Sequence, residues 1–192
     1  MLAVGLVATA SADVVDRIAV VVGAKVITES EVLDDLRLTE FLNQQPLDLS
    51  AAKRREAADK MVDQQIIRNE METERYTQPK PGEADAMLAN FRREHFKIEV
   101  EYRSALAHYG VTEAQVKQRL LWQLAVIEFT DARFRPELPL PPAGNVQTAN
   151  RMRAGTKPAP STAGKDVDQL LDQWLKQQRG TTRVVFKQEA FQ

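Results

Sequence analysis

The hydrophobic pattern opens with two short apolar runs. β-branched residues fill Ile18–Val22, residues 23–25 (Gly-Ala-Lys) have the composition of a turn, and Val26 and Ile27 resume the run. This pattern predicts a tight β-hairpin. A two-stranded hairpin is marginal in water unless another strand or a helical layer supports it. The other strand-like run is residues 183–187, so we expect the two ends of the chain to meet.

Helices are predicted from apolar residues that recur at three- and four-residue spacing. Two capping boxes, Thr28 with Glu31 and Thr112 with Gln115, mark where two of them begin. Gly110 stands where a glycine ends a helix. The helix after Thr112 is apolar on more than one face, which indicates that it packs between other helices or packs one face on a partner. The expected helices span residues 30–43, 50–74, 83–96, 100–109, 113–134 and 166–178.

A proline-rich segment interrupts this helical pattern. Six of the nine prolines fall within residues 136–164, together with three glycines and few large apolar residues. This composition is typical of a linker that is extended in part. We therefore expect one helical domain at 13–135, a linker at 136–164, and a C-terminal helix and strand at 165–192 that complete the same domain.

The opening sequence VDRIAVVVGAKVITESEV resembles the start of the mature SurA-type periplasmic chaperones. The order of elements is also similar to that family, because an amphipathic helix and a short strand follow the interruption. The resemblance implies a mainly α fold with a small β element, of the SurA/trigger-factor peptide-binding type. In the family, one or two parvulin-type prolyl isomerase domains occupy the place of the linker. Residues 136–164 are too few for such a domain, so the resemblance covers the chaperone module alone.

Residues 1–12 carry no charge and end in Ala-Ser-Ala, an A-x-A cleavage pattern. We interpret them as the remnant of a signal peptide and expect a periplasmic, exported protein, although the usual basic start is missing. The alternative is a disordered apolar N-terminus. The apolar stretch is shorter than the ~20 residues that span a bilayer, so no transmembrane segment is predicted. A net charge of −1 gives no reason to expect nucleic acid as a partner.

The sequence offers no candidate for catalysis or for a bound cofactor. Cysteine is absent, and His95 and His108 form no metal-binding spacing. Nucleotide-binding and serine-nucleophile motifs are also missing. The carboxylates stand among arginines and lysines as solvated helix faces. We therefore expect neither an enzyme nor a metal protein.

Methionines and aromatic residues recur through the middle helices. Flexible thioethers and broad rings suit a surface that accepts many sequences. The same spacing is also what an ordinary helical core contains, and this alternative stays open for each residue. The candidate peptide-binding residues are Met71, Met87, Phe91, Phe96, Tyr102 and Tyr109.

These observations predict a chaperone-like protein that binds unfolded or partly folded exported polypeptides and has no isomerase activity. The resemblance implies that the clients are chiefly outer-membrane proteins and leaves room for a separate isomerase as a partner. One alternative is an envelope scaffold that uses the same fold for one fixed protein partner. A third hypothesis, a prolyl isomerase, is disfavoured because the isomerase domain is missing.

Overall fold

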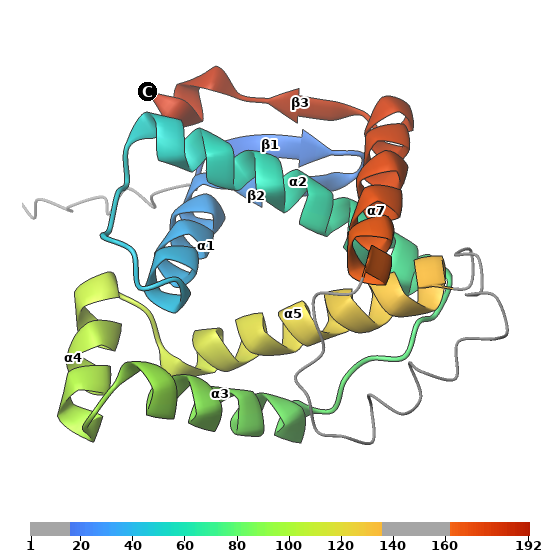
Figure 1. Cartoon of the computed structure of the whole chain (residues 1–192). Helices are drawn as coiled ribbons and strands as arrows, with labels where there is room; N and C mark the ends of the chain where they lie inside the picture. Colours follow the sequence, from blue (N-terminus) through green and yellow to red (C-terminus); the bar gives the residue numbers. More distant parts are fainter. Residues whose placement is uncertain (1–15, 136–161) are drawn as a thin grey trace, which may run out of the picture.

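A three-stranded antiparallel sheet joins the two ends of the chain in the computed structural model, which describes residues 16–135 and 162–192 (Figure 1). β1 (Ile18–Val22) lies between β2 (Lys25–Thr28) and β3 (Val184–Phe186). Val21 of β1 stands opposite Val26 on one side and Val185 on the other. The predicted hairpin and the meeting of the two ends are therefore confirmed.

The other described elements are helical, so the expectation of a mainly α fold with a small β element is confirmed. Figure 1 shows α2 lying across the sheet, with α3 and α5 side by side in a second layer. A 3-10 helix, η2 (Gln188–Phe191), follows β3. The α-helices are α1 (Glu29–Leu42), α2 (Ala51–Thr73), α3 (Pro81–His95), α4 (Glu99–Tyr109), α5 (Glu113–Phe134) and α7 (Thr162–Thr181).

Both predicted capping boxes are present. At α1 the Glu31 backbone N–H donates to Thr28 Oγ1 (3.3 Å), and the Thr28 N–H donates to the Glu31 carboxylate (2.8 Å). At α5 the Gln115 N–H donates to Thr112 Oγ1 (3.3 Å), and the Thr112 N–H donates to Gln115 Oε1 (2.8 Å). Gly110 ends α4 in the left-handed conformation, at φ 66°. Local sequence thus sets these helix boundaries.

Three predicted boundaries need correction. α3 begins at Pro81 rather than at residue 83, because proline is well tolerated in the first turn, where its missing N–H is not needed. α7 begins at Thr162, so residues 162–164 belong to the helix and not to the linker. α7 also ends at Thr181, past the predicted end at residue 178, and Gly180 lies within it. The predicted remnant at 1–12 and the rest of the linker, 136–161, lie outside the described residues.

The buried side chains form two separate clusters. The sheet core lies between the sheet, α2, α7 and the second half of α5, and the helical core lies between α3, α4 and the first half of α5. α1 contributes Val32 and Leu36 to the sheet core but Leu38 and Phe41 to the helical core. α5 is divided in the same way, with Val116 in the helical core and Phe129 in the sheet core. These two helices therefore connect the cores.

α7 closes the sheet core through one large ring and one ion-pair cluster. Trp174 is 8% exposed, and its ring centroid lies 5.7 Å from that of Phe129 on α5. Arg179 reaches α2, where its Nε lies 2.6 Å from Asp63 and its Nη1 lies 2.9 Å from Asp59. These hydrogen bonds and charges raise the pKa of Arg179 above its ordinary value. Apolar burial and charge pairing thus hold α7 on the domain.

We predict that Trp174→Ala lowers the free energy of unfolding by about 3–5 kcal/mol, because it opens a cavity where α7 packs against α5. Urea denaturation followed by circular dichroism measures this loss. Gln173→Ala, at the exposed neighbouring position on α7, is the control and should change stability by less than about 0.5 kcal/mol. Equal stabilities for Trp174→Ala and the wild type would show that α7 is an independent tail.

Candidate functional site: a cavity between the two cores

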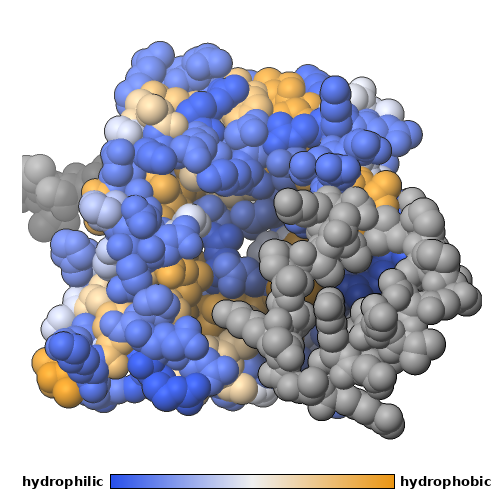
Figure 2. All heavy atoms as spheres, viewed as in Figure 1, coloured by the Kyte–Doolittle hydropathy of each residue, from blue (hydrophilic) through white to orange (hydrophobic). Residues whose placement is uncertain are grey.

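A cavity of about 530 Å³ lies between α1, α2 and α5, with β2 at its edge. This volume falls within the roughly 300–1,000 Å³ that is usual for ligand pockets. Figure 2 shows the molecule hollowed here, with both hydrophilic and hydrophobic residues around the opening. The cavity occupies the position where α1 and α5 pass from one core to the other.

Apolar and amide side chains share the lining of the cavity. Gln64, Gln65, Gln78, Gln115 and Gln118 contribute amides. Gln65 donates to Asn69 Oδ1 (2.9 Å), and Gln115 is engaged in the α5 capping box. The side chains of Gln64, Gln78 and Gln118 make no hydrogen bond within the described residues, so their donors and acceptors are available to a ligand. The apolar lining comes from Val26, Ile27, Leu38, Met61, Pro79, Leu121, Trp122 and Ala125.

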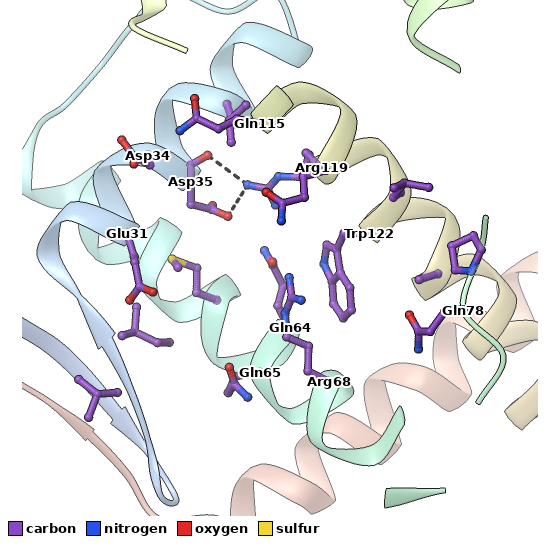
Figure 3. A pocket seen from close by; sticks show the side chains of 18 residues that line it. Glu31, Asp34, Asp35, Gln64, Gln65, Arg68, Gln78, Gln115, Arg119 and Trp122 are labelled. Carbon is purple, nitrogen blue, oxygen red and sulfur yellow. Dashed lines mark hydrogen bonds and ion pairs between the residues drawn. The ribbon is translucent and has the colours of Figure 1, made fainter. Parts of the chain in front are cut away.

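An ion pair joins α1 to α5 at one wall of the cavity (Figure 3). The Arg119 guanidinium pairs with the Asp35 carboxylate, and it also donates to the Asp35 carbonyl (3.2 Å) and to Thr39 Oγ1 (3.4 Å). The Arg119 and Asp35 side chains are only 12% and 11% exposed. The pair therefore bridges the two helices that connect the cores.

A second arginine, Arg68 on α2, faces the cavity beside Trp122 of α5 (Figure 3). The Arg68 Cζ lies 3.8 Å from the centroid of the Trp122 ring, in cation–π contact. Partial burial, and then the nearby charge of Arg119, lower the pKa of Arg68. Arg68 makes no ion pair or hydrogen bond to any described residue. It is a cation of the lining held by an aromatic ring alone.

The six residues proposed from the sequence lie away from this cavity. Met71 is 3% exposed in the sheet core, and Tyr102 is 1% exposed in the helical core, so neither forms a surface. Burial among apolar neighbours favours the core alternative for these two residues, and their role in peptide binding stays a prediction. Met87, Phe91, Phe96 and Tyr109 pack half-buried against the helical core.

Three of these half-buried residues, Phe91, Phe96 and Tyr109, form one aromatic cluster around Phe41. The ring centroid of Phe41 lies 5.5 Å from Phe91, 6.1 Å from Phe96 and 5.6 Å from Tyr109. These distances are those of interacting aromatic pairs. The cluster joins α1 to α3 and α4, so we assign it to packing. A role of the half-buried members in client binding stays a prediction.

The Tyr102 hydroxyl is buried and makes no hydrogen bond within the described residues. Burial and the negative charge of Glu113 raise the pKa of Tyr102 to about 12, against the opposing effect of Arg92. The Arg92 Cζ lies 4.6 Å from the centroid of the ring. The hydroxyl lies near the Glu113 carboxylate, but it makes no hydrogen bond of normal geometry with it, so its burial is not compensated.

The structure suggests no metal site or membrane span in its described parts. Within residues 16–135 and 162–192, no group of three histidine or acidic side chains could hold a metal ion. His95 and His108 are exposed and contact the rings of Phe91 and Tyr109. Among the helices of these ranges, none is long and apolar enough to cross a membrane.

No protein-family model matches the chain, and no curated protein matches it. The cavity is therefore the feature that indicates a function. Sequence analysis missed its lining, because helical periodicity identifies the apolar face of each helix separately. The signal available in the sequence was the number of glutamines on α2 and α5, the two longest helices. That signal does not show which residues of one helix face those of the other.

We predict that Arg119→Met destabilises the protein by roughly 3 kcal/mol, because it leaves the Asp35 carboxylate buried without a partner. Combining it with Asp35→Asn should lose less than the sum of the two single changes. The control is Lys117→Met on the same helix, whose ion pairs to Asp85 and Glu113 are exposed. It should lose much less stability in urea denaturation than Arg119→Met, because exposed ion pairs contribute little. Additive losses would contradict the coupling.

We predict that Tyr102→Phe changes stability at neutral pH by less than about 1 kcal/mol, because the lost hydroxyl has no partner. The wild type should lose stability from about pH 10 upwards, where the unfolded tyrosine ionises, and continue to lose it until the folded pKa of about 12. Tyr102→Phe should lose less over this interval, measured by denaturation at stepped pH. Tyr109→Phe, which removes a 2.6 Å hydrogen bond to the Gln45 carbonyl, should instead cost about 1 kcal/mol at pH 7.

Proposed function

We propose that this protein binds unfolded exported polypeptides in the cavity between its two cores, as a chaperone without isomerase activity. The observation that carries the proposal is the mixed lining of that cavity. Apolar residues such as Leu121 and Met61 offer contacts to client side chains, and Gln64, Gln78 and Gln118 offer free amides. A concave surface that is open to solvent and combines these two features suits an extended polypeptide segment.

The amides explain how binding could tolerate different client sequences. A glutamine side chain presents one acceptor and two N–H donors, which match the carbonyl and N–H of any peptide unit. Recognition through the backbone is independent of the client's side chains. The neighbouring apolar lining adds affinity in proportion to the area it covers. An unfolded chain carries both features, whereas a folded protein has paired most of its backbone groups.

Release requires no nucleotide if this affinity stays moderate. Ordering a client segment costs roughly 1–2 kcal/mol per residue in backbone entropy, which offsets much of the contact energy. Dissociation constants in the micromolar range correspond to about 8 kcal/mol of net binding. We therefore expect rapid exchange of clients without ATP.

The order of elements supports assignment to the SurA/trigger-factor peptide-binding type. An N-terminal hairpin, several helices, and a final helix and strand that return to the hairpin are the features of that module. Residues 136–161 leave too little chain for a parvulin domain. The proposed location of the protein is the periplasm. The proposed clients are outer-membrane proteins, and a separate isomerase is a potential partner.

One observation favours a scaffold for a fixed partner as the second candidate. Ile98 and Val100, at the start of α4, are 59% and 67% exposed. α4 lies at the end of the domain away from the sheet (Figure 1). Two exposed aliphatic side chains so close in the sequence suit a small permanent contact. The scaffold reading predicts one stoichiometric partner that depends on Ile98 and Val100, whereas the chaperone reading predicts many clients that depend on the cavity.

We predict that Leu121→Gln weakens binding of an unfolded outer-membrane β-barrel protein by about tenfold, because it removes an apolar contact inside the cavity. Fluorescence anisotropy of a labelled client measures the dissociation constant. The control is Ile127→Gln on the same helix, since Ile127 is 57% exposed and does not line the cavity. It should leave the dissociation constant within about twofold.

The wild type should also delay aggregation of the same client without ATP and should not accelerate prolyl isomerisation of a test peptide. Equal weakening by Leu121→Gln and Ile127→Gln would remove the cavity from the proposal. A wild-type protein that neither delays aggregation nor binds client at micromolar concentration would refute the chaperone function. Binding lost only when Ile98 and Val100 are replaced would favour the scaffold.

A further inference from the structure

Arg68 and Trp122 form a feature of the cavity that general polypeptide binding does not require. The guanidinium lies over the indole, with its Cζ 3.8 Å from the ring centroid. A stacked guanidinium has one face covered, but its five N–H donors point outward in the guanidinium plane. Because Arg68 donates to no described residue, this donor fork remains open toward the cavity (Figure 3).

The other charged groups of the lining are already engaged. Arg119 pairs with Asp35, Asp34 pairs with Arg37 at 3.2 Å, and Glu31 accepts the capping hydrogen bond at α1. Glu72 lies one helical turn after Arg68 and is close enough to favour the positive charge of Arg68, but the two side chains form no ion pair. Among the described residues, Arg68 is therefore the lining cation without an ion-pair partner, although Glu72 and Asp35 are close enough to favour its charge.

We propose that Arg68, oriented by Trp122, binds a carboxylate carried by the bound polypeptide. This inference rests on the proposed function, because it names a chemical group of the same client in the same cavity. A planar guanidinium matches a carboxylate through two parallel N–H···O bonds, and contact with an aromatic ring restricts the side chain before binding. The carboxylate belongs to an Asp or Glu side chain or to the C-terminus of the client.

Local electrostatics favour such a ligand. Partial burial removes water from Arg68, and Arg119 repels it, and both effects lower its pKa. A carboxylate in the cavity would accept charge-assisted hydrogen bonds from Arg68, and these would replace the hydrogen bonds to water that burial removes. The acidic groups of the lining oppose the ligand only weakly, because Asp34 and Asp35 each face an arginine.

Four variants of a ten-residue peptide with alternating apolar and hydroxyl side chains test the proposal. One is neutral and C-terminally amidated, one has a free C-terminal carboxylate, and two are amidated with Glu or Gln at one central position. We expect at least one carboxylate peptide to bind the wild type about tenfold more tightly than its neutral counterpart. The free-acid and Glu peptides together identify the source of the carboxylate.

Arg68→Gln should abolish this preference and leave the dissociation constant of the neutral peptide within about twofold. Arg68→Lys should restore part of the preference, since lysine keeps the charge without the planar fork. Glu72→Gln is the matched control on the same helix and should retain or strengthen the preference. Unchanged melting temperatures would show that the variants fold.

The outcomes separate this inference from the proposed function. Equal binding of neutral and carboxylate peptides by the wild type would refute the carboxylate subsite and leave polypeptide binding intact. A preference that survives in Arg68→Gln would refute the assignment to Arg68. Failure of all peptides and of an unfolded client to bind would refute the function, and the subsite with it.

Discussion

The pairing of β3 with β1 is the constraint on which the rest of the structure depends. It joins residues more than 160 positions apart, and backbone hydrogen bonds flank it on both sides. The Gly23 N–H donates to the Arg183 carbonyl and the Lys187 N–H donates to the Ala19 carbonyl, each at 2.8 Å. This pairing gives β1 its second neighbour and places α7 over α2 and α5. Burial of Trp174 and the ion pairs of Arg179 follow from that placement.

The cavity is a consequence of how two helices are shared between the cores. α1 and α5 each bury one end in the sheet core and the other in the helical core, and the change of core falls between Leu36 and Leu38 in α1 and between Leu120 and Ala125 in α5. Polar residues of these helices face the cavity at this change, and the nearly buried Arg119–Asp35 pair is tolerated there because each charge has its partner. A polar seam between apolar cores also gives the cavity its mixed chemistry.

Local signals in the sequence predicted most of the fold. Capping boxes at Thr28 and Thr112 and the β-branched run at Ile18–Val22 act over a few residues, and the structure has them where they were expected. The site could not be predicted in this way. Arg68 and Trp122 are 54 positions apart on different helices, and no periodicity relates them. The methionine and aromatic pattern could not separate core from surface, because the side chains that fill a core are the same ones that suit an adaptable surface, and the structure buries Met71 and Tyr102 of this set.

The division into two cores also determines how the cavity can change size. Since the sheet core and the helical core share no buried side chain, a small rotation of one relative to the other would uncover neither. Such a hinge movement would strain only the turns of α1 and α5 between the cores and the contacts across the cavity. In such a movement, bending of α1 and α5, rather than repacking of a hydrophobic interior, would set the width of the opening. Under the proposed function, the cavity would then accept client segments of different thickness with little change in domain stability.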